Sequence, residues 1–122
     1  MSTRIDEFQG VELPTEEWQP HLDHVNKEIE RGADVEVTIE VVGDPIVGTE
    51  VERLPLDSIT HEDGDDQIAI GVGGRGRRYP AVLWHFVDEP RRLVALDDER
   101  LPTGMIVESE DETLTLVRLY WP

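Results

Sequence analysis

The sequence predicts an α+β fold, in which one N-terminal amphipathic helix packs on a curled, mainly antiparallel sheet of seven or eight strands. Three observations lead to this class. One segment near the N-terminus has apolar residues at helical spacing, the rest of the chain alternates apolar and polar residues in short runs, and no helical pattern separates those runs. Parallel strands need long crossover connections, which are usually helices, so antiparallel pairing is favoured.

The predicted helix follows Thr15, whose hydroxyl suits an N-cap, and ends near Gly32, a candidate C-cap. Its apolar residues are spaced by four, three and four positions, which puts them on one stripe. Pro20 either begins the regular helix or kinks its first turn, because a proline beyond the first turn removes a backbone hydrogen bond. The stripe consists of Trp18, Leu22, Val25 and Ile29.

The length of 122 residues matches one ordinary domain. Residues 1–13 have scattered apolar positions without a helical period, and we interpret them as an N-terminal arm with room for one short strand. Residues 14–122 are expected to form a single α+β domain.

After Gly32 the hydrophobic period changes to two, which is typical of half-buried strands. The clearest predicted strand alternates Val35, Val37, Ile39 and Val41 with polar residues. Further strands are predicted around Val47–Val51, Ser58–His61, Ile68–Val72, Leu93–Leu96, Met105–Glu108 and Leu114–Trp121.

Two segments have patterns that predict their place in the sheet. Leu54-Pro55-Leu56 is expected to interrupt the extended chain at an edge, bulge or corner, because proline cannot donate to a strand ladder. Residues 79–87 are apolar on both faces and are therefore expected to be central. Because a long twisted sheet tends to curl or split, an SH3-like or Sm-like open barrel is the sharper expectation.

A family resemblance is carried by segments of the predicted helix, strands and turns. They are Glu17-Trp18, Val37-Thr38-Ile39-Glu40-Val41-Val42-Gly43, Leu54-Pro55-Leu56 with Ile59, Ile68-Ala69-Ile70, His85 with Pro90, and Ile106-Val107-Glu108-Ser109-Glu110-Asp111. From about Trp18 to Leu119 the chain resembles the Domain of Unknown Function 5335, a family of short acidic prokaryotic proteins. Two departures are visible: Glu112 stands where a glycine is expected in the last hairpin turn, and Trp121-Pro122 extends past the expected end. The resemblance implies no activity, cofactor or catalytic residue.

The charge balance limits the classes of partner. The chain has 28 acidic and 11 basic side chains, ten of them arginine, and a formal net charge of -17. Overall attraction to nucleic acid or anionic lipid is therefore disfavoured. Because the acids are spread over the whole length, we interpret them as an adaptation to a salt-rich cytoplasm. The alternative is an ordinary acidic protein from a GC-rich genome, which favours arginine over lysine.

The absence of cysteine excludes disulfides, a thiolate nucleophile, zinc fingers and iron-sulfur clusters. No segment approaches the ~20 apolar residues that a membrane-spanning helix needs, and the first thirty residues lack a signal-peptide run. We therefore expect a cytoplasmic protein that does not enter a membrane.

A metal site is one hypothesis for the helix. Glu17, His21, His24 and Glu28 are spaced by four, three and four residues, so they share a flank beside the apolar stripe. Two imidazoles and two carboxylates can bind a divalent metal, and a metal-dependent hydrolase would follow. The alternative is a solvated flank with i,i+4 Glu-His contacts.

An arginine island, defined as Arg75, Arg77, Arg78, Arg91 and Arg92, is the second candidate site. The segment from residue 75 to residue 92 contains these five arginines and only two acids, Asp88 and Glu89. Guanidinium groups beside Tyr79 are suited to RNA or nucleotides. The alternative is a set of arginines that pair with surrounding acids.

His85 lies in the apolar run Ala81–Val87, and a buried imidazole there is a candidate general base. No GxSxG motif or cysteine supplies a nucleophile, so a satisfied core histidine is the alternative. With no recognisable catalytic set, we expect a small non-enzymatic binding module without a cofactor. Its partner would be another protein, or a second copy bound through a sheet edge or the end of the last strand.

Overall fold

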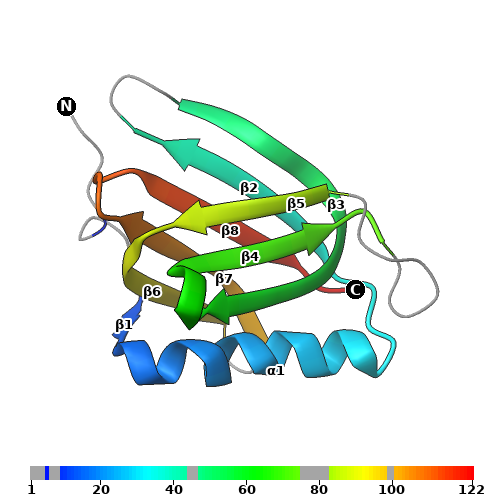
Figure 1. The fold of residues 1–122 in the computed structure, drawn as a ribbon. Coiled ribbons are helices and arrows are strands. Elements are labelled where there is room, and N and C mark those ends of the chain that lie inside the picture. The colour runs from blue at the N-terminus through cyan, green and yellow to red at the C-terminus, as the bar shows by residue number, and fades with distance from the viewer. Residues whose placement is uncertain (1–4, 6–8, 44–46, 75–82, 99–100) are drawn as a thin grey trace.

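One helix packs on an eight-stranded antiparallel sheet in a computed structural model that describes residues 5, 9–43, 47–74, 83–98 and 101–122 (Figure 1). The strand order is β1-β6-β7-β8-β2-β3-β4-β5, and the sheet is not closed. The predicted class and strand number are therefore confirmed. The elements are β1 (Val11–Leu13), the 3₁₀ turn η2 (Thr15–Glu17), α1 (Trp18–Glu30), β2 (Glu36–Val42), β3 (Val47–Glu62), the 3₁₀ turn η3 (Asp63–Asp65), β4 (Gln67–Val72), β5 (Leu83–Asp88), β6 (Pro90–Asp98), β7 (Leu101–Ser109) and β8 (Leu114–Tyr120).

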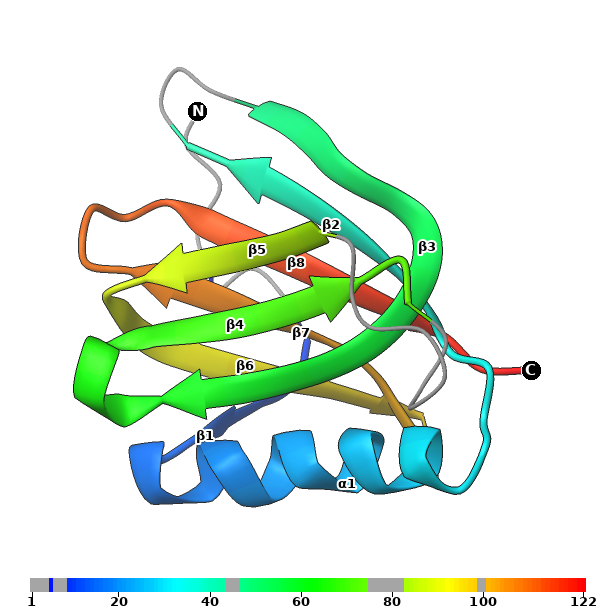
Figure 2. The same ribbon diagram turned by 45° about the vertical axis from the view of Figure 1, so that its right-hand side comes forward.

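The sheet curls, so that β4 and β5 lie in front of β7 and β8 in both views, while α1 runs beside β3 (Figures 1 and 2). The main core fills the space inside this curl and against the helix. This core contains the whole predicted helix stripe and the inward-facing residues of seven strands. Its fully buried members include Leu22, Val37, Ile39, Ile68, Ile70, Val72, Leu93 and Val107.

The ends of α1 follow from three residues. Thr15 begins the 3₁₀ turn η2, so the expected N-cap at Thr15 is wrong; the residue before α1 is Glu17, whose side chain makes no capping hydrogen bond. Pro20 does not begin the regular helix, which starts at Trp18; it is the third residue of α1, in the first turn, where no intrahelical N–H bond is lost.

Gly32 ends the helix, as expected, with a φ of 102°. The Gly32 N–H donates to Ile29 O at 3.0 Å, and the Ala33 N–H donates to Glu28 O at 3.0 Å. These two bonds form a Schellman motif, whose left-handed position favours glycine because it has no Cβ.

β3 is continuous over 16 residues, so the extended chain is not interrupted at Leu54-Pro55-Leu56, but the bulge that was one of the expected alternatives is present. The strand changes its partner there instead: Pro55 is paired with β2, whereas Leu56 begins the pairing with β4. A bulge precedes the change, with Arg53 at a φ of 46°. Proline is tolerated because a strand that changes partner does not need an unbroken N–H ladder on either side.

Beyond Pro55, β3 is no longer paired with β2, and side chains of α1 form hydrogen bonds with backbone groups on this edge of β3. Asn26 accepts a hydrogen bond from the Ile59 N–H at 2.9 Å and donates to Ile59 O at 2.8 Å. Gln19 accepts from the His61 N–H at 2.7 Å. The helix thus acts as a surrogate strand for this edge, in addition to supplying apolar contacts.

β5 is the last strand of the sheet, so the expectation that residues 79–87 are central is wrong. Residues 79–82 lie outside the described residues, and the described part pairs with β4. The prediction was based on an apolar pattern on both faces, but Leu83, Trp84 and Phe86 are each 47% exposed, whereas Val87 is buried.

The N-terminal residues belong to the sheet and to a second small core. β1 pairs with β6, with Val11 opposite Ala95. On the outer face of the sheet, Ile5 is 1% exposed and packs against Ile106 and Leu114. Among the described residues, no helix is long and apolar enough to cross a bilayer.

Candidate functional site

The four residues of the metal hypothesis lie on one flank of α1 and η2. Glu17 and His24 are exposed, His21 and Glu28 are partly buried, and Glu28 accepts a hydrogen bond from Arg31 at 2.8 Å. In the part of the chain that the structure describes, no group of three His, Asp or Glu side chains is arranged to hold a metal ion. The structure therefore gives the metal hypothesis no support.

The described half of the arginine island is engaged in ion pairs. Arg91 Nη2 lies 2.6 Å from Glu108 Oε1, and Arg92 Nη2 lies 2.6 Å from Glu12 Oε1. The hydrogen bond to Glu108 raises the pKa of the Arg91 guanidinium. These pairs join β6 to β7 and to β1, which is a structural role. Arg75, Arg77 and Arg78 lie outside the described residues, so the nucleic-acid hypothesis stays a prediction.

His85 lies on the inner face of β5 opposite Ile70 and is partly buried. Burial lowers the pKa of its imidazole, against a smaller raising effect of the Glu50 and Asp88 charges. Within the described residues no hydrogen bond orients the ring, and the chain has no cysteine. A base without an orienting partner and a nucleophile does not make a catalytic set.

The aromatic edge, which we define as Trp84 and Phe86 on β5, is an exposed pair of large apolar side chains on the sheet. Each side chain is 47% exposed, and the two rings are stacked with centroids 6.4 Å apart at 15°. They stand on the outer face opposite Gly71 and Ala69 of β4, so small neighbours leave them uncovered. Leu83, on the inner face of the same strand, is also 47% exposed.

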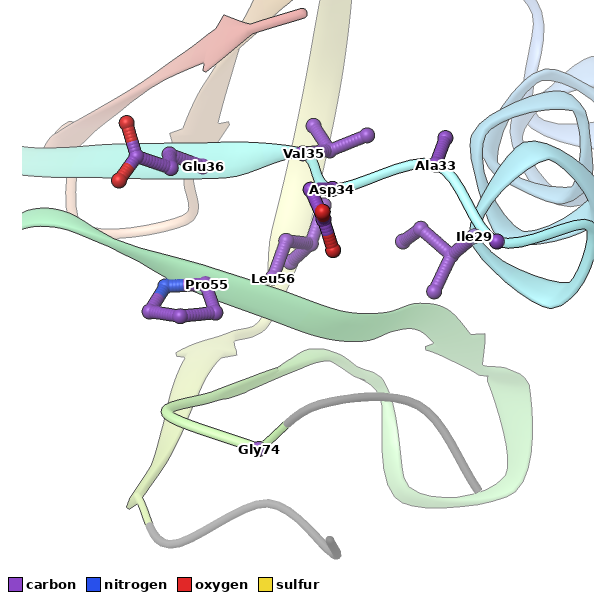
Figure 3. A pocket seen from close by; sticks show the side chains of 9 residues that line it. Ile29, Ala33, Asp34, Val35, Glu36, Pro55, Leu56 and Gly74 are labelled. Carbon is purple, nitrogen blue, oxygen red and sulfur yellow. The ribbon is translucent and has the colours of Figure 1, made fainter. Parts of the chain in front are cut away.

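A depression of about 280 Å³ lies where α1 ends (Figure 3). Figure 3 shows Ile29, the segment Ala33–Glu36 and Leu56 around it, with Gly74 on the far side. Glu36 is already paired with Arg53 at 2.9 Å. Because Gly74 directly precedes residues that are not described, the complete wall of this depression is not defined.

A larger hollow of about 380 Å³, here called the outer-face hollow, lies over β2, β6, β7 and β8. Apolar residues of the second core form part of it, and Arg118 and Tyr120 stand at its polar side. The spacing of these residues in the sequence does not predict a site, because they come together only through strand register. Its lining residues are Thr38, Glu40, Leu96, Thr103, Met105, Ile106, Leu116, Val117, Arg118, Leu119 and Tyr120.

Comparison with known proteins places the chain in a family. A family model described as "Family of unknown function (DUF5335)" matches residues 9–122, which extend from β1 through β8. The chain belongs to this family. The DUF5335 match confirms the resemblance and extends it on both sides of the expected 18–119 range. No curated protein and no solved structure matches the chain, so the SH3-like or Sm-like comparison stays a prediction.

Proposed function

We propose that this DUF5335 protein is a non-enzymatic binding module that adds an extended, positively charged segment of a partner protein to β5. The observation that carries the proposal is a strand with the composition of a central strand at the edge of the sheet. Strands that are apolar on both faces are normally covered on both faces. Here the missing neighbour would be supplied by the partner.

The edge of β5 supports strand addition. Among the described residues β5 is hydrogen-bonded to β4 alone, which leaves the other row of backbone groups available for a partner strand. Exposed edges are usually protected by lysine, proline or an inward charge. Between Leu83 and Val87 the strand has none of these, and the first carboxylate in β5 is Asp88.

The aromatic edge supplies the apolar contact that a partner strand needs. Tryptophan and other large aromatic residues dominate the binding energy of many protein interfaces. Trp84 and Phe86 are already stacked, so little side-chain freedom remains to be lost when a partner covers them. A partner with apolar residues at alternate positions would place those residues on the two rings.

Charge determines which partner fits. Asp88 and Glu89 are exposed at the end of β5, and Glu50 lies near His85. A second copy would bring another net charge of -17 to this edge, so self-association is disfavoured. A basic extended segment is attracted instead by the net charge of the whole chain.

The proposal is tested by calorimetric titration of a blocked ten-residue peptide that alternates valine and lysine, at physiological salt. We expect binding, and we expect Trp84→Lys to weaken it by at least about tenfold, since a tryptophan hot spot is lost. The matched control is Val11→Lys, which makes the same charge change at an exposed residue of the opposite edge strand, and should change affinity less than about twofold.

A peptide that alternates proline and lysine separates strand addition from general charge attraction. It has the same charge, but it lacks an N–H group at every second residue. Three results would overturn the proposal: equal affinity for both peptides, an equal loss of affinity in Trp84→Lys and Val11→Lys, or no binding of the valine-lysine peptide.

A further inference from the structure

We propose that the outer-face hollow binds a small monocarboxylate with an apolar tail, and that Arg118 is the residue that holds its carboxylate. This site is separate from β5 and does not depend on the proposed binding module. It rests on three observations: a glycine in a row of side chains, an arginine that pairs with none of the described carboxylates, and a polar cluster fixed by a bulge.

Gly104 leaves a row of residues on the outer face without a side chain between Leu96 and Arg118, which both line the hollow. Strand register places Leu96 opposite Gly104, Gly104 opposite Arg118, and Arg118 opposite Thr38. A Cβ on Gly104 would collide with the Val117 backbone oxygen, so no side chain can fill the gap. Along this row, no side chain therefore separates Leu96 from Arg118.

The next row of the outer face supplies an apolar wall. Ile106 lies opposite Leu116, and both line the hollow together with Leu96. Ile106 is 1% exposed, whereas Leu116 and Leu96 are only partly buried. A short alkyl or aromatic group lying over Gly104 would cover these two side chains.

Arg118 differs from the other arginines that the structure describes. Arg31, Arg53, Arg91 and Arg92 each lie within 3 Å of a glutamate oxygen. No described carboxylate pairs with Arg118, which is exposed and lines the hollow beside Tyr120. Because none of the described acids pairs with it, the Arg118 guanidinium is available for an external anion.

The polar side of the hollow is held in place by the β3 bulge. The Arg53 N–H donates to Thr38 Oγ1 at 3.1 Å, and the Arg53 guanidinium lies 4.0 Å from the centre of the Tyr120 ring. Thr38 and Arg118 both lower the pKa of the Tyr120 hydroxyl through hydrogen bonding. Bulges commonly direct side chains toward a site, and this one directs Arg53 over Tyr120.

Charge and size select the class of ligand. The described lining has one guanidinium, Arg118, and one carboxylate, Glu40, so a singly charged carboxylate meets less repulsion there than a doubly charged phosphate. A volume of about 380 Å³ is at the small end of ligand pockets, which range over roughly 300–1,000 Å³. The ligand is therefore a small amphiphilic monoanion.

The site is tested by titrating octanoate, octanol and octyl phosphate into the full chain and following backbone amide shifts by NMR. We expect saturable octanoate shifts centred on Thr38, Gly104 and Arg118, with octanol and octyl phosphate each at least about tenfold weaker. Arg118→Gln should weaken octanoate by about tenfold or more and bring it close to octanol.

Arg31→Gln is the matched control, because it removes an exposed guanidinium from α1, and it should leave octanoate affinity within about twofold. Because Arg118 is exposed, Arg118→Gln should fold normally, which unchanged amide shifts elsewhere in the sheet would confirm. The assignment would be overturned if octanoate did not bind, if octanol bound equally well, or if octyl phosphate bound more tightly. An equal loss of octanoate affinity in Arg118→Gln and Arg31→Gln would also overturn it.

Discussion

Glu112, in the turn of the last hairpin, has a left-handed backbone conformation. Its φ is 70°, and its N–H donates to Ser109 O at 2.9 Å. This is the position where the family resemblance leads one to expect glycine. A side chain in the left-handed region costs roughly 1–2 kcal/mol, so the turn keeps its shape in this chain despite strain.

Glu112→Gly is therefore expected to raise the free energy of unfolding by about 1 kcal/mol, because the strain disappears while glycine adds some unfolded-state entropy. Urea denaturation measures the change. Glu110→Gly removes the same charge from the same turn at a residue without positive φ, and it should destabilise the protein. A loss of stability in both variants would contradict this account.

His85 predicts a pH dependence whose sign follows from burial. Its pKa in the folded protein lies below the ordinary value of 6.5, so the unfolded chain binds a proton at higher pH than the folded chain. Stability from this residue is therefore present above about pH 6.5 and is lost as the pH falls through the folded-state pKa.

The measurement compares urea denaturation at pH 7.5 and 5.5. The native protein should lose more stability between these conditions than His85→Gln, which has no imidazole to protonate. His24→Gln, on the exposed flank of α1, is the control and should behave like the native protein. An equal loss in native protein and His85→Gln would show that the imidazole makes no such contribution.

At the scale of elements, the contact between α1 and β3 depends on polar side chains as well as on the apolar stripe. Asn26 satisfies both backbone groups of Ile59. Asn26→Ala leaves a partly buried N–H and C=O without these partners, and we expect a loss of about 1–3 kcal/mol in unfolding free energy. Lys27→Ala, at the neighbouring exposed residue, should change stability by less than about 0.5 kcal/mol. Similar values for both would contradict the role of Asn26.

The elements also show where sequence patterns are sufficient and where they are not. The helix stripe, Gly32 and the strand at 35–41 depend on residues close in the chain, and their patterns predicted them correctly. The partner change at Pro55 and the edge position of β5 depend on which distant strands pair, which local period does not encode. The outer-face hollow was missed for the same reason, since Leu96, Gly104 and Arg118 meet only through the register of three strands.

At the scale of the whole molecule, the net charge of -17 opposes the compact state through repulsion among dispersed carboxylates. Raising KCl from about 0.1 to 1 M shortens the Debye length from about 10 to 3 Å. We propose a salt-adapted protein and therefore expect the melting temperature to rise over this range. A variant with Glu16→Gln, Asp63→Asn and Asp65→Asn, all at exposed positions, should gain less. An unchanged or lower melting temperature of the native protein in 1 M KCl would contradict salt adaptation.

β1 and β5 are the two edge strands of the curled sheet. These edges are unequal: β1 is three residues long and tied to β6 through the Glu12 to Arg92 ion pair, whereas β5 exposes a stacked aromatic pair. The asymmetry is the basis for assigning partner binding to one edge alone.

The most direct test of that assignment is amide hydrogen exchange of the protein with and without the valine-lysine peptide. Addition of a partner strand to β5 predicts slower exchange at Leu83–Asp88, with no change at Val11–Leu13 of β1. Unchanged exchange in β5 when the peptide is bound, or equal protection of both edges, would contradict the proposal.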